Sequence, residues 1–237
     1  MSAFTPEMTV GEIAAQSPAS IRVFEKHRID YCCGGGLAVG EACAARGLNA
    51  AEVLQEVDGA AGPAVSADWR SAQLGSLIEH IVENHHGYLK AHLPRMASML
   101  EKILAKHSER HGDTLRPLAA TFRGLKEELE AHLMKEEMIL FPLIRSMEAT
   151  QGAAGGPAAF HCGSVQNPIR VMLMEHDSAG EALARMRQLT SGYTPPEDAC
   201  NTFRGFYFEL AEMERDLHVH IHLENNILFP RAVALQG

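Results

Sequence analysis

The segment HLMKEEMILFP at residues 132–142 returns as HIHLENNILFP at residues 220–230. Both copies contain a histidine, a glutamate four residues later, and then Ile-Leu-Phe-Pro. An acidic residue, Glu128 or Asp216, also precedes each histidine by four positions. This internal repeat indicates that one structural unit occurs twice in the chain.

The residues around each copy follow the period of an amphipathic helix. Alternating steps of four and three give an apolar stripe through Leu125, Leu129 and His132, and its counterpart through Leu217 and His220. In each stripe, the repeated histidine and glutamate occupy positions on the otherwise apolar face. Two further stripes contain one histidine each, His86 in the first and His176 in the other.

Four amphipathic patterns lie at about residues 70–110, 115–147, 167–190 and 196–228, with a Gly-rich loop near 152–158. They predict an all-α fold, an antiparallel four-helix bundle over residues 68–237. Shorter helical patterns over residues 1–60 predict a small helical domain that precedes the bundle. The Gly- and Pro-containing stretch at 58–67 is expected to link the two.

A histidine or glutamate on a buried face is costly unless another group compensates it, and a metal ion can do so. Four histidines and two glutamates are too many for one tetrahedral zinc. They suit two ions with bridging carboxylates; iron is favoured, with manganese or zinc as alternatives. The expected ligands are one histidine from each stripe and the two repeated glutamates, with His85 as the reserve for His86: His86, His132, Glu136, His176, His220 and Glu224.

Neighbouring acidic residues have other expected roles. Glu137 lies five positions after His132, about 140° around the helix, so it is not expected to share the ligand face. Its counterpart in the second copy is Asn225. Hydrogen bonds to neighbouring carboxylates are expected to orient the ligand histidines; the candidates are Glu128, Glu175 and Asp216.

Cys32 and Cys33 are adjacent and precede three glycines. An ordinary disulfide between adjacent cysteines is not expected. The pair is interpreted as a reactive or metal-handling thiol pair, exposed by the glycine turn and with a pKa lowered by a nearby helix N-terminus. The alternative is a pair of small residues at a tight turn.

Composition argues against several classes of partner. The net charge is −9, and no basic stripe is present to neutralise phosphates, so nucleic acid is not expected. No stretch approaches the roughly 20 apolar residues that span a bilayer, so no membrane partner is expected. The start of the chain lacks a signal-peptide pattern, and five cysteines do not suggest a disulfide framework; the cytoplasm is therefore expected.

These motifs resemble the RIC (repair of iron centres) family, the YtfE/ScdA-type di-iron proteins. DYCCGG at residues 30–35 is similar to the signature of the family's small N-terminal domain. Its haemerythrin-like domain is matched by His85-His86 with Leu93-Pro94, by both repeat copies, and by Glu175-His176-Asp177. The resemblance covers nearly the whole chain.

The resemblance implies an oxo-bridged non-haem di-iron centre on the six residues above, with both glutamates bridging. It implies nitric oxide or dioxygen as the small ligand, and iron–sulfur proteins damaged by nitrosative or oxidative stress as clients. Classical haemerythrin has an aspartate five residues after its last histidine, where this sequence has Glu224 after four. That difference argues against simple reversible oxygen carriage.

Three functions share the same ligands, and the sequence leaves them open. The first is repair of damaged iron–sulfur clusters, with Cys32 and Cys33 assisting transfer. The second is a nitric oxide or oxygen sink or sensor without a repair role. The third is an enzyme that reduces nitric oxide. Of the three, an iron donor or a nitric oxide-binding protein is expected rather than an enzyme with many turnovers. The oligomeric state is also open, with a homodimer as one option.

Overall fold

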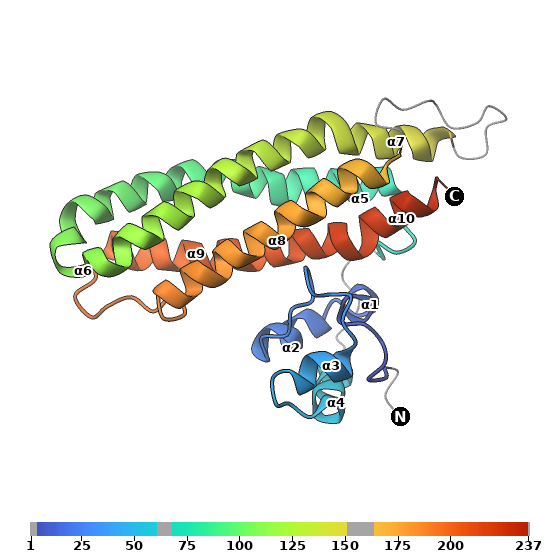
Figure 1. Ribbon diagram of the computed structural model, residues 1–237, viewed down its shortest axis with the longest axis horizontal. Helices are drawn as coiled ribbons and strands as arrows, with labels where there is room; N and C mark the ends of the chain where they lie inside the picture. The colour runs from blue at the N-terminus through green and yellow to red at the C-terminus, as the bar shows by residue number, and fades with distance from the viewer. Residues whose placement is uncertain (1–3, 61–67, 151–163, 237) are drawn as a thin grey trace. The chain divides into compact units, whose positions relative to one another are not determined.

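The structure is a computed structural model that describes residues 4–60, 68–150 and 164–236. The regular elements of these residues are helices (Figure 1). The chain divides into two compact units, one of residues 1–78, 144–165 and 218–237, the other of residues 79–143 and 166–217. The expected all-α class, a helical bundle preceded by a small helical region, is confirmed.

The N-terminal region consists of four short helices: α1 (Val10–Gln16), α2 (Ser20–Lys26), α3 (Val39–Ala44) and α4 (Ala50–Ala60). Thr9 caps α1, since its hydroxyl accepts from the backbone N–H of Glu12 and the Glu12 carboxylate accepts from that of Thr9. These helices enclose a core of their own, which includes Ile13 and Phe24.

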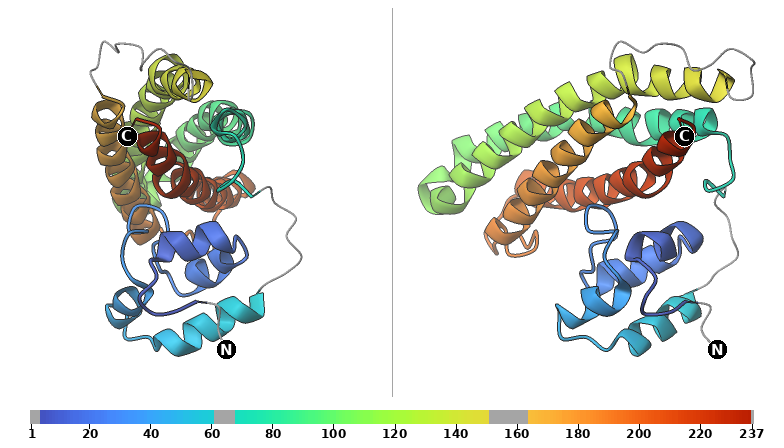
Figure 2. Two further views of the ribbon diagram at one scale, coloured as in Figure 1. Left: turned by 90° about the vertical axis from the view of Figure 1, so that its right-hand side faces the viewer. Right: turned by 45° about the vertical axis from the view of Figure 1, so that its right-hand side comes forward.

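The bundle helices begin with α5 (Leu74–His80), the π-helical turn η1 (Ile81–His86) and α6 (Gly87–Lys135). The backbone of α6 is non-helical at His111 (φ −118°, ψ 19°), and the chain reverses direction in this region, so α6 contributes two antiparallel helices (Figures 1 and 2). The π-helical turn η2 (Glu136–Leu140) and α7 (Phe141–Thr150) follow it.

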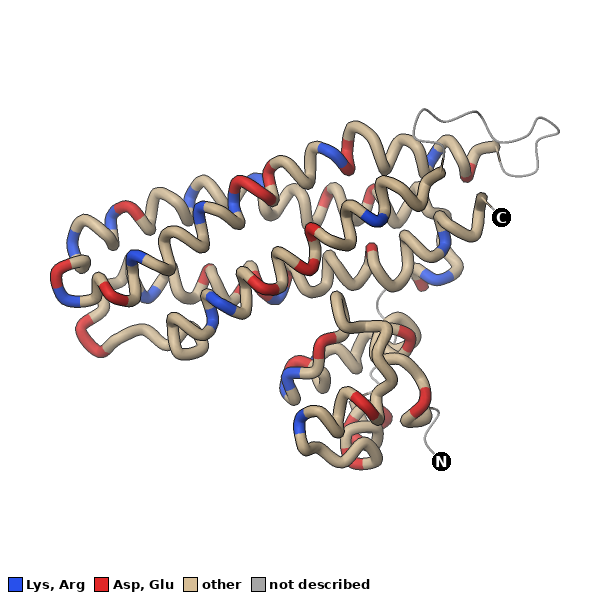
Figure 3. Tube along the Cα trace, viewed as in Figure 1, with Lys and Arg blue, Asp and Glu red and all other residues tan. Residues whose placement is uncertain are grey.

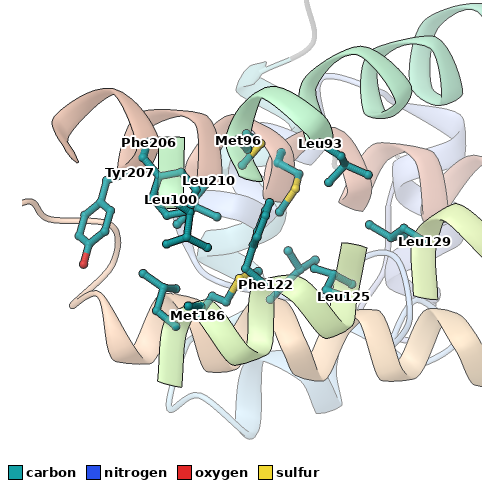
Figure 4. Packing of buried hydrophobic residues seen from close by; sticks show 14 of the residues in the cluster. Leu93, Met96, Leu100, Phe122, Leu125, Leu129, Met186, Phe206, Tyr207 and Leu210 are labelled. Carbon is teal, nitrogen blue, oxygen red and sulfur yellow. The ribbon is translucent and has the colours of Figure 1, made fainter. Parts of the chain in front are cut away.

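The remaining helices are α8 (Gln166–Leu189) and α9 (Asn201–Leu223), then the π-helical turn η3 (Glu224–Leu228) and α10 (Phe229–Ala234). Leucine, methionine and phenylalanine side chains from α6, α8 and α9 meet in one apolar core (Figure 4). Within it, Phe122 of α6 packs edge-on against Phe206 of α9, with ring centroids 5.7 Å apart. The expected apolar stripes therefore do form the interior.

Some expected boundaries were wrong. Residues 58–60 belong to α4 rather than to a linker, and 61–67 lie outside the described residues, as does the expected loop at 152–158. Helix α9 begins at Asn201 rather than near residue 196. A turn precedes the helix instead, in which the Ala199 N–H donates to the Pro196 carbonyl at 3.0 Å.

Acidic and basic residues are interspersed along the bundle helices (Figure 3). None of the described helices combines the length and apolar character that crossing a bilayer requires.

We expect Phe122→Ala to lower the free energy of unfolding by about 3–5 kcal/mol, because it empties a well-packed position of the core. Phe208→Ala is the matched control: its ring is 64% exposed, and we expect a change within about 0.5 kcal/mol. Urea unfolding followed by circular dichroism measures both. Equal losses in the two variants would contradict the proposed location of the core.

Candidate metal centre

The six expected ligand residues are all buried, and Glu136 and Glu224 have no exposed surface at all. Their ligand atoms form two groups, and within each group these atoms lie within 4.8 Å of one another. One group comprises His86, Glu136, His220 and Glu224. The other comprises His132, Glu136, His176 and Glu224.

Both glutamates belong to both groups, so a carboxylate oxygen of one lies within 4.8 Å of a carboxylate oxygen of the other. Two buried carboxylates at this separation repel each other strongly unless they share a proton or a cation offsets their charge. Imidazole nitrogens and carboxylate oxygens are ligands that iron, manganese and zinc accept. The residues therefore fit metal cations.

The two carboxylate oxygens of Glu136 lie close to two different imidazoles. Its Oε2 lies 3.3 Å from His86 Nε2, and its Oε1 lies 3.4 Å from His132 Nε2. Each oxygen of the Glu136 carboxylate therefore lies nearest to a histidine of a different ligand group. In the second repeat copy, Glu224 Oε1 lies 3.1 Å from His220 Nε2.

Two of these histidines have carboxylate partners on the side away from Glu136. His86 Nδ1 lies 2.7 Å from Glu137 Oε1, and His132 Nδ1 lies 2.8 Å from Glu175 Oε2. Each carboxylate also accepts from a lysine, Glu137 from Lys90 and Glu175 from Lys135. Such partners fix the tautomer and the orientation of a ligating imidazole.

Burial and hydrogen bonding act in opposite directions on the pKa values of Glu137 and Glu175. Burial acts to raise the pKa of Glu137, but hydrogen bonds from Lys90 and His86 hold it below its usual value. The pKa of Glu175 is lowered in the same way against burial, by Lys135 and His132. Both side chains are therefore anionic near neutral pH and favour an Nδ1–H on the histidine, which leaves Nε2 available as a ligand atom.

The repeated motif also explains the π-helical turns at the site. η2 begins at Glu136 and η3 at Glu224, and the prolines at 142 and 230 follow each turn closely. A proline has no N–H to give to the carbonyl four residues earlier. The missing hydrogen bond falls within each π-helical turn, and π-helical turns are frequent at functional sites.

Two of the carboxylates expected to orient ligand histidines, Glu128 and Asp216, make other contacts. Glu128 is exposed, and its Oε2 accepts from Ser178 Oγ at 3.4 Å rather than orienting a ligand histidine. Asp216 Oδ1 lies 2.8 Å from Nδ1 of His85, the residue held in reserve for His86. His85 is buried but belongs to neither ligand group.

Glu137 is the site residue that the sequence reasoning missed. The helix geometry that removed it from the ligand face also turns it by about 100° from Glu136. That rotation directs it to the neighbouring helix, where His86 and Lys90 lie. The sequence did contain a signal for this role, since Glu137 is an acidic residue directly after the expected ligand Glu136.

The thiol pair Cys32 and Cys33 differs from the sequence-based expectation in its exposure and in its pKa. The Sγ atoms of Cys32 and Cys33 are 4.0 Å apart, so they form no disulfide. Cys32 is buried, and hydrogen bonding to Cys33, burial and nearby Asp30 raise its pKa well above the usual value. The expected exposure and lowered pKa are therefore wrong for Cys32, because the surrounding segment folds as turns rather than as a helix N-terminus.

We expect Glu136→Gln to weaken metal binding strongly, because a negatively charged residue common to both ligand groups is neutralised. Glu137→Gln should keep the stoichiometry of the wild type but lower metal affinity about 10- to 100-fold, because it weakens the hydrogen bond to His86. Anaerobic competition for ferrous iron against a chelator measures both. The control is Glu127→Gln, an exposed position on the same helix; if Glu137→Gln matches it, the assigned role of Glu137 is wrong.

Comparisons with known proteins agree with this geometry. Residues 77–232 match the model of the hemerythrin HHE cation binding domain, and residues 6–61 match ScdA_N, a domain of unknown function. The chain is 38% identical over 228 residues to the iron-sulfur cluster repair protein YtfE of Pectobacterium carotovorum, covering 96% of this chain and 97% of that protein. It is 38% identical over 234 residues to YtfE of Musicola paradisiaca, covering 96% of each. The chain therefore belongs to the RIC family of YtfE-type iron–sulfur cluster repair proteins, with a hemerythrin-type cation-binding domain.

Proposed function

We propose that this protein repairs iron–sulfur clusters damaged by nitrosative or oxidative stress, and that it binds nitric oxide at a di-iron site. One observation carries the proposal: two groups of buried ligands share both Glu136 and Glu224. Two overlapping groups suit two ions held side by side. The relatives named as repair proteins support the wider role.

Each ion would take two histidines and share both glutamates. His86 and His220 belong to one group, and His132 and His176 to the other. When bound, the iron ions would supply a redox-active centre with room for a small ligand such as nitric oxide or dioxygen. The protein's own contribution is to hold the imidazoles in place, through Glu137 and Glu175.

Cys32 and Cys33 are the proposed thiol contribution to transfer of iron to the client. The client is an iron–sulfur protein with a damaged cluster, and the iron that it receives is cargo. Among the described residues, Cys32, Cys43 and Cys200 are free thiols. Free thiols support a reducing compartment, and we propose the cytoplasm.

One observation favours a second function, a nitric oxide sink without a repair role. The raised pKa and the burial of Cys32 make it a weak nucleophile at neutral pH. In a sink the thiols would be dispensable, and nitric oxide would bind stoichiometrically to the reduced protein.

We expect the iron-loaded protein to restore activity to a client whose cluster nitric oxide has damaged, beyond what an equal amount of free ferrous iron restores. The double variant Cys32→Ser, Cys33→Ser should lose this excess and still bind nitric oxide, because its metal ligands are intact. Client activity and the visible spectrum of the nitrosyl adduct are the two measurements.

The outcomes separate the two functions. Recovery by the wild type that does not exceed that of free iron would contradict repair and leave the sink. Full recovery by the double variant would show that repair proceeds without the thiols.

A further inference from the structure

The π-helical turn η3 contacts the backbone of residues 31–36, which contain Cys32 and Cys33 and are called the thiol loop here. Asn226 Nδ2 donates to the carbonyl of Tyr31 at 3.1 Å and to that of Cys32 at 3.3 Å. His222 Nδ1, one helical turn earlier, lies 3.2 Å from the same Tyr31 carbonyl. The Tyr31 ring packs edge-on against His222, with centroids 5.6 Å apart. His222 is buried in this packing.

Two glycines leave room for the Asn226 side chain. A Cβ at Gly11 would lie 2.4 Å from Asn226 Oδ1, and a Cβ at Gly35 would lie 2.6 Å from the same atom. The two glycines also join directly, since Gly11 N–H donates to the Gly35 carbonyl at 2.8 Å. A Cβ at neighbouring Gly36 would contact nothing within 4 Å. The space that the Asn226 side chain occupies, called the slot here, therefore requires glycine at positions 11 and 35.

The repeat shows that the ligand motif does not itself require these side chains. By register, Met138 is the counterpart of Asn226, and Met134 is the counterpart of His222. Both methionines are exposed, Met138 by 72%. The first copy therefore carries its histidine and glutamate with apolar, uncovered residues at these positions. The polar pair in the second copy matches the thiol loop that it contacts.

We propose that Asn226 is a positioning residue: together with His222, it fastens the Tyr31–Cys32 backbone to the turn that begins at Glu224 and so keeps Cys32 in its buried arrangement. Through this contact the thiol pair is fastened to a turn that also supplies a proposed metal ligand. Its relevance to repair rests on the function proposed above. The fastening itself is a property of the fold and can be tested without it.

The test is the rate at which Cys32 of the full, iron-loaded chain reacts anaerobically with a maleimide, located by fragment-ion mass spectrometry. We expect Asn226→Ala to raise this rate about tenfold, because both side-chain hydrogen bonds to the loop are lost. Met138→Ala, the register-matched control, should leave the rate unchanged. A wild-type rate in a folded Asn226→Ala variant would overturn the proposal.

A second pair of variants tests the slot. Gly11→Ala should also accelerate the reaction of Cys32, whereas Gly36→Ala should not. Asn226→Ala removes the two closest atoms that the new methyl group would meet and leaves the Gly35 carbonyl oxygen at 3.0 Å. Gly11→Ala should therefore accelerate the reaction less in that background than in the wild type. Multiplicative effects would contradict the slot. If Asn226→Ala proves too unstable to study, Gly11→Ala and Gly36→Ala test the slot without it, and equal Cys32 rates in these two variants would overturn the proposal.

Hydrogen exchange supplies a readout that general destabilisation would not mimic. Amides of residues 31–36 should exchange faster in Asn226→Ala, while those of the bundle core around Phe122 stay as in the wild type. Uniformly faster exchange would contradict a local fastening. The two proposals can fail separately. If the double variant Cys32→Ser, Cys33→Ser retains full repair, the thiols have no role in repair. If Asn226→Ala exposes Cys32 in the same series, the positioning role of Asn226 still holds.

Discussion

Two glutamates without solvent exposure, Glu136 and Glu224, lie within 4.8 Å of each other in the interior. This close approach of like charges is the constraint on which the site depends, because it is unfavourable unless something neutralises the pair. Four buried imidazoles lie near the two glutamates, and bound cations would provide positive charge that offsets the two carboxylates. Outside this shell, Glu137 with Lys90 and Glu175 with Lys135 hold two of the imidazoles. The apolar core fills the bundle away from the site.

One repeated motif supplies both glutamates, and its two copies have diverged around them. In each copy the proline that ends the motif removes a helical hydrogen bond, and a π-helical turn begins at the glutamate. The first copy then has Glu137, which contacts His86. The second has Asn226, which contacts the thiol loop. The ligand positions are thus kept, while neighbouring positions serve different contacts.

The sequence was sufficient for the fold class, because apolar stripes with helical spacing define the inward faces and polar breaks separate them. It was sufficient to nominate the six residues that the structure gathers into two groups, since a repeat marked the glutamates and each stripe held a buried histidine. It could not show that Glu137 reaches His86, or that His222 is buried, because both depend on which helix or loop packs alongside. For the same reason it misjudged Cys32, whose thiol pKa is set by neighbours that the turn brings together.

The central claim is that two cations occupy the space between these ligands. The most direct measurement is an anomalous difference map, recorded at the iron absorption edge from crystals of the protein loaded with ferrous iron. The account predicts two peaks, one among His86, Glu136, His220 and Glu224, the other among His132, Glu136, His176 and Glu224. A map without peaks there, or with iron bound only at other residues, would contradict it.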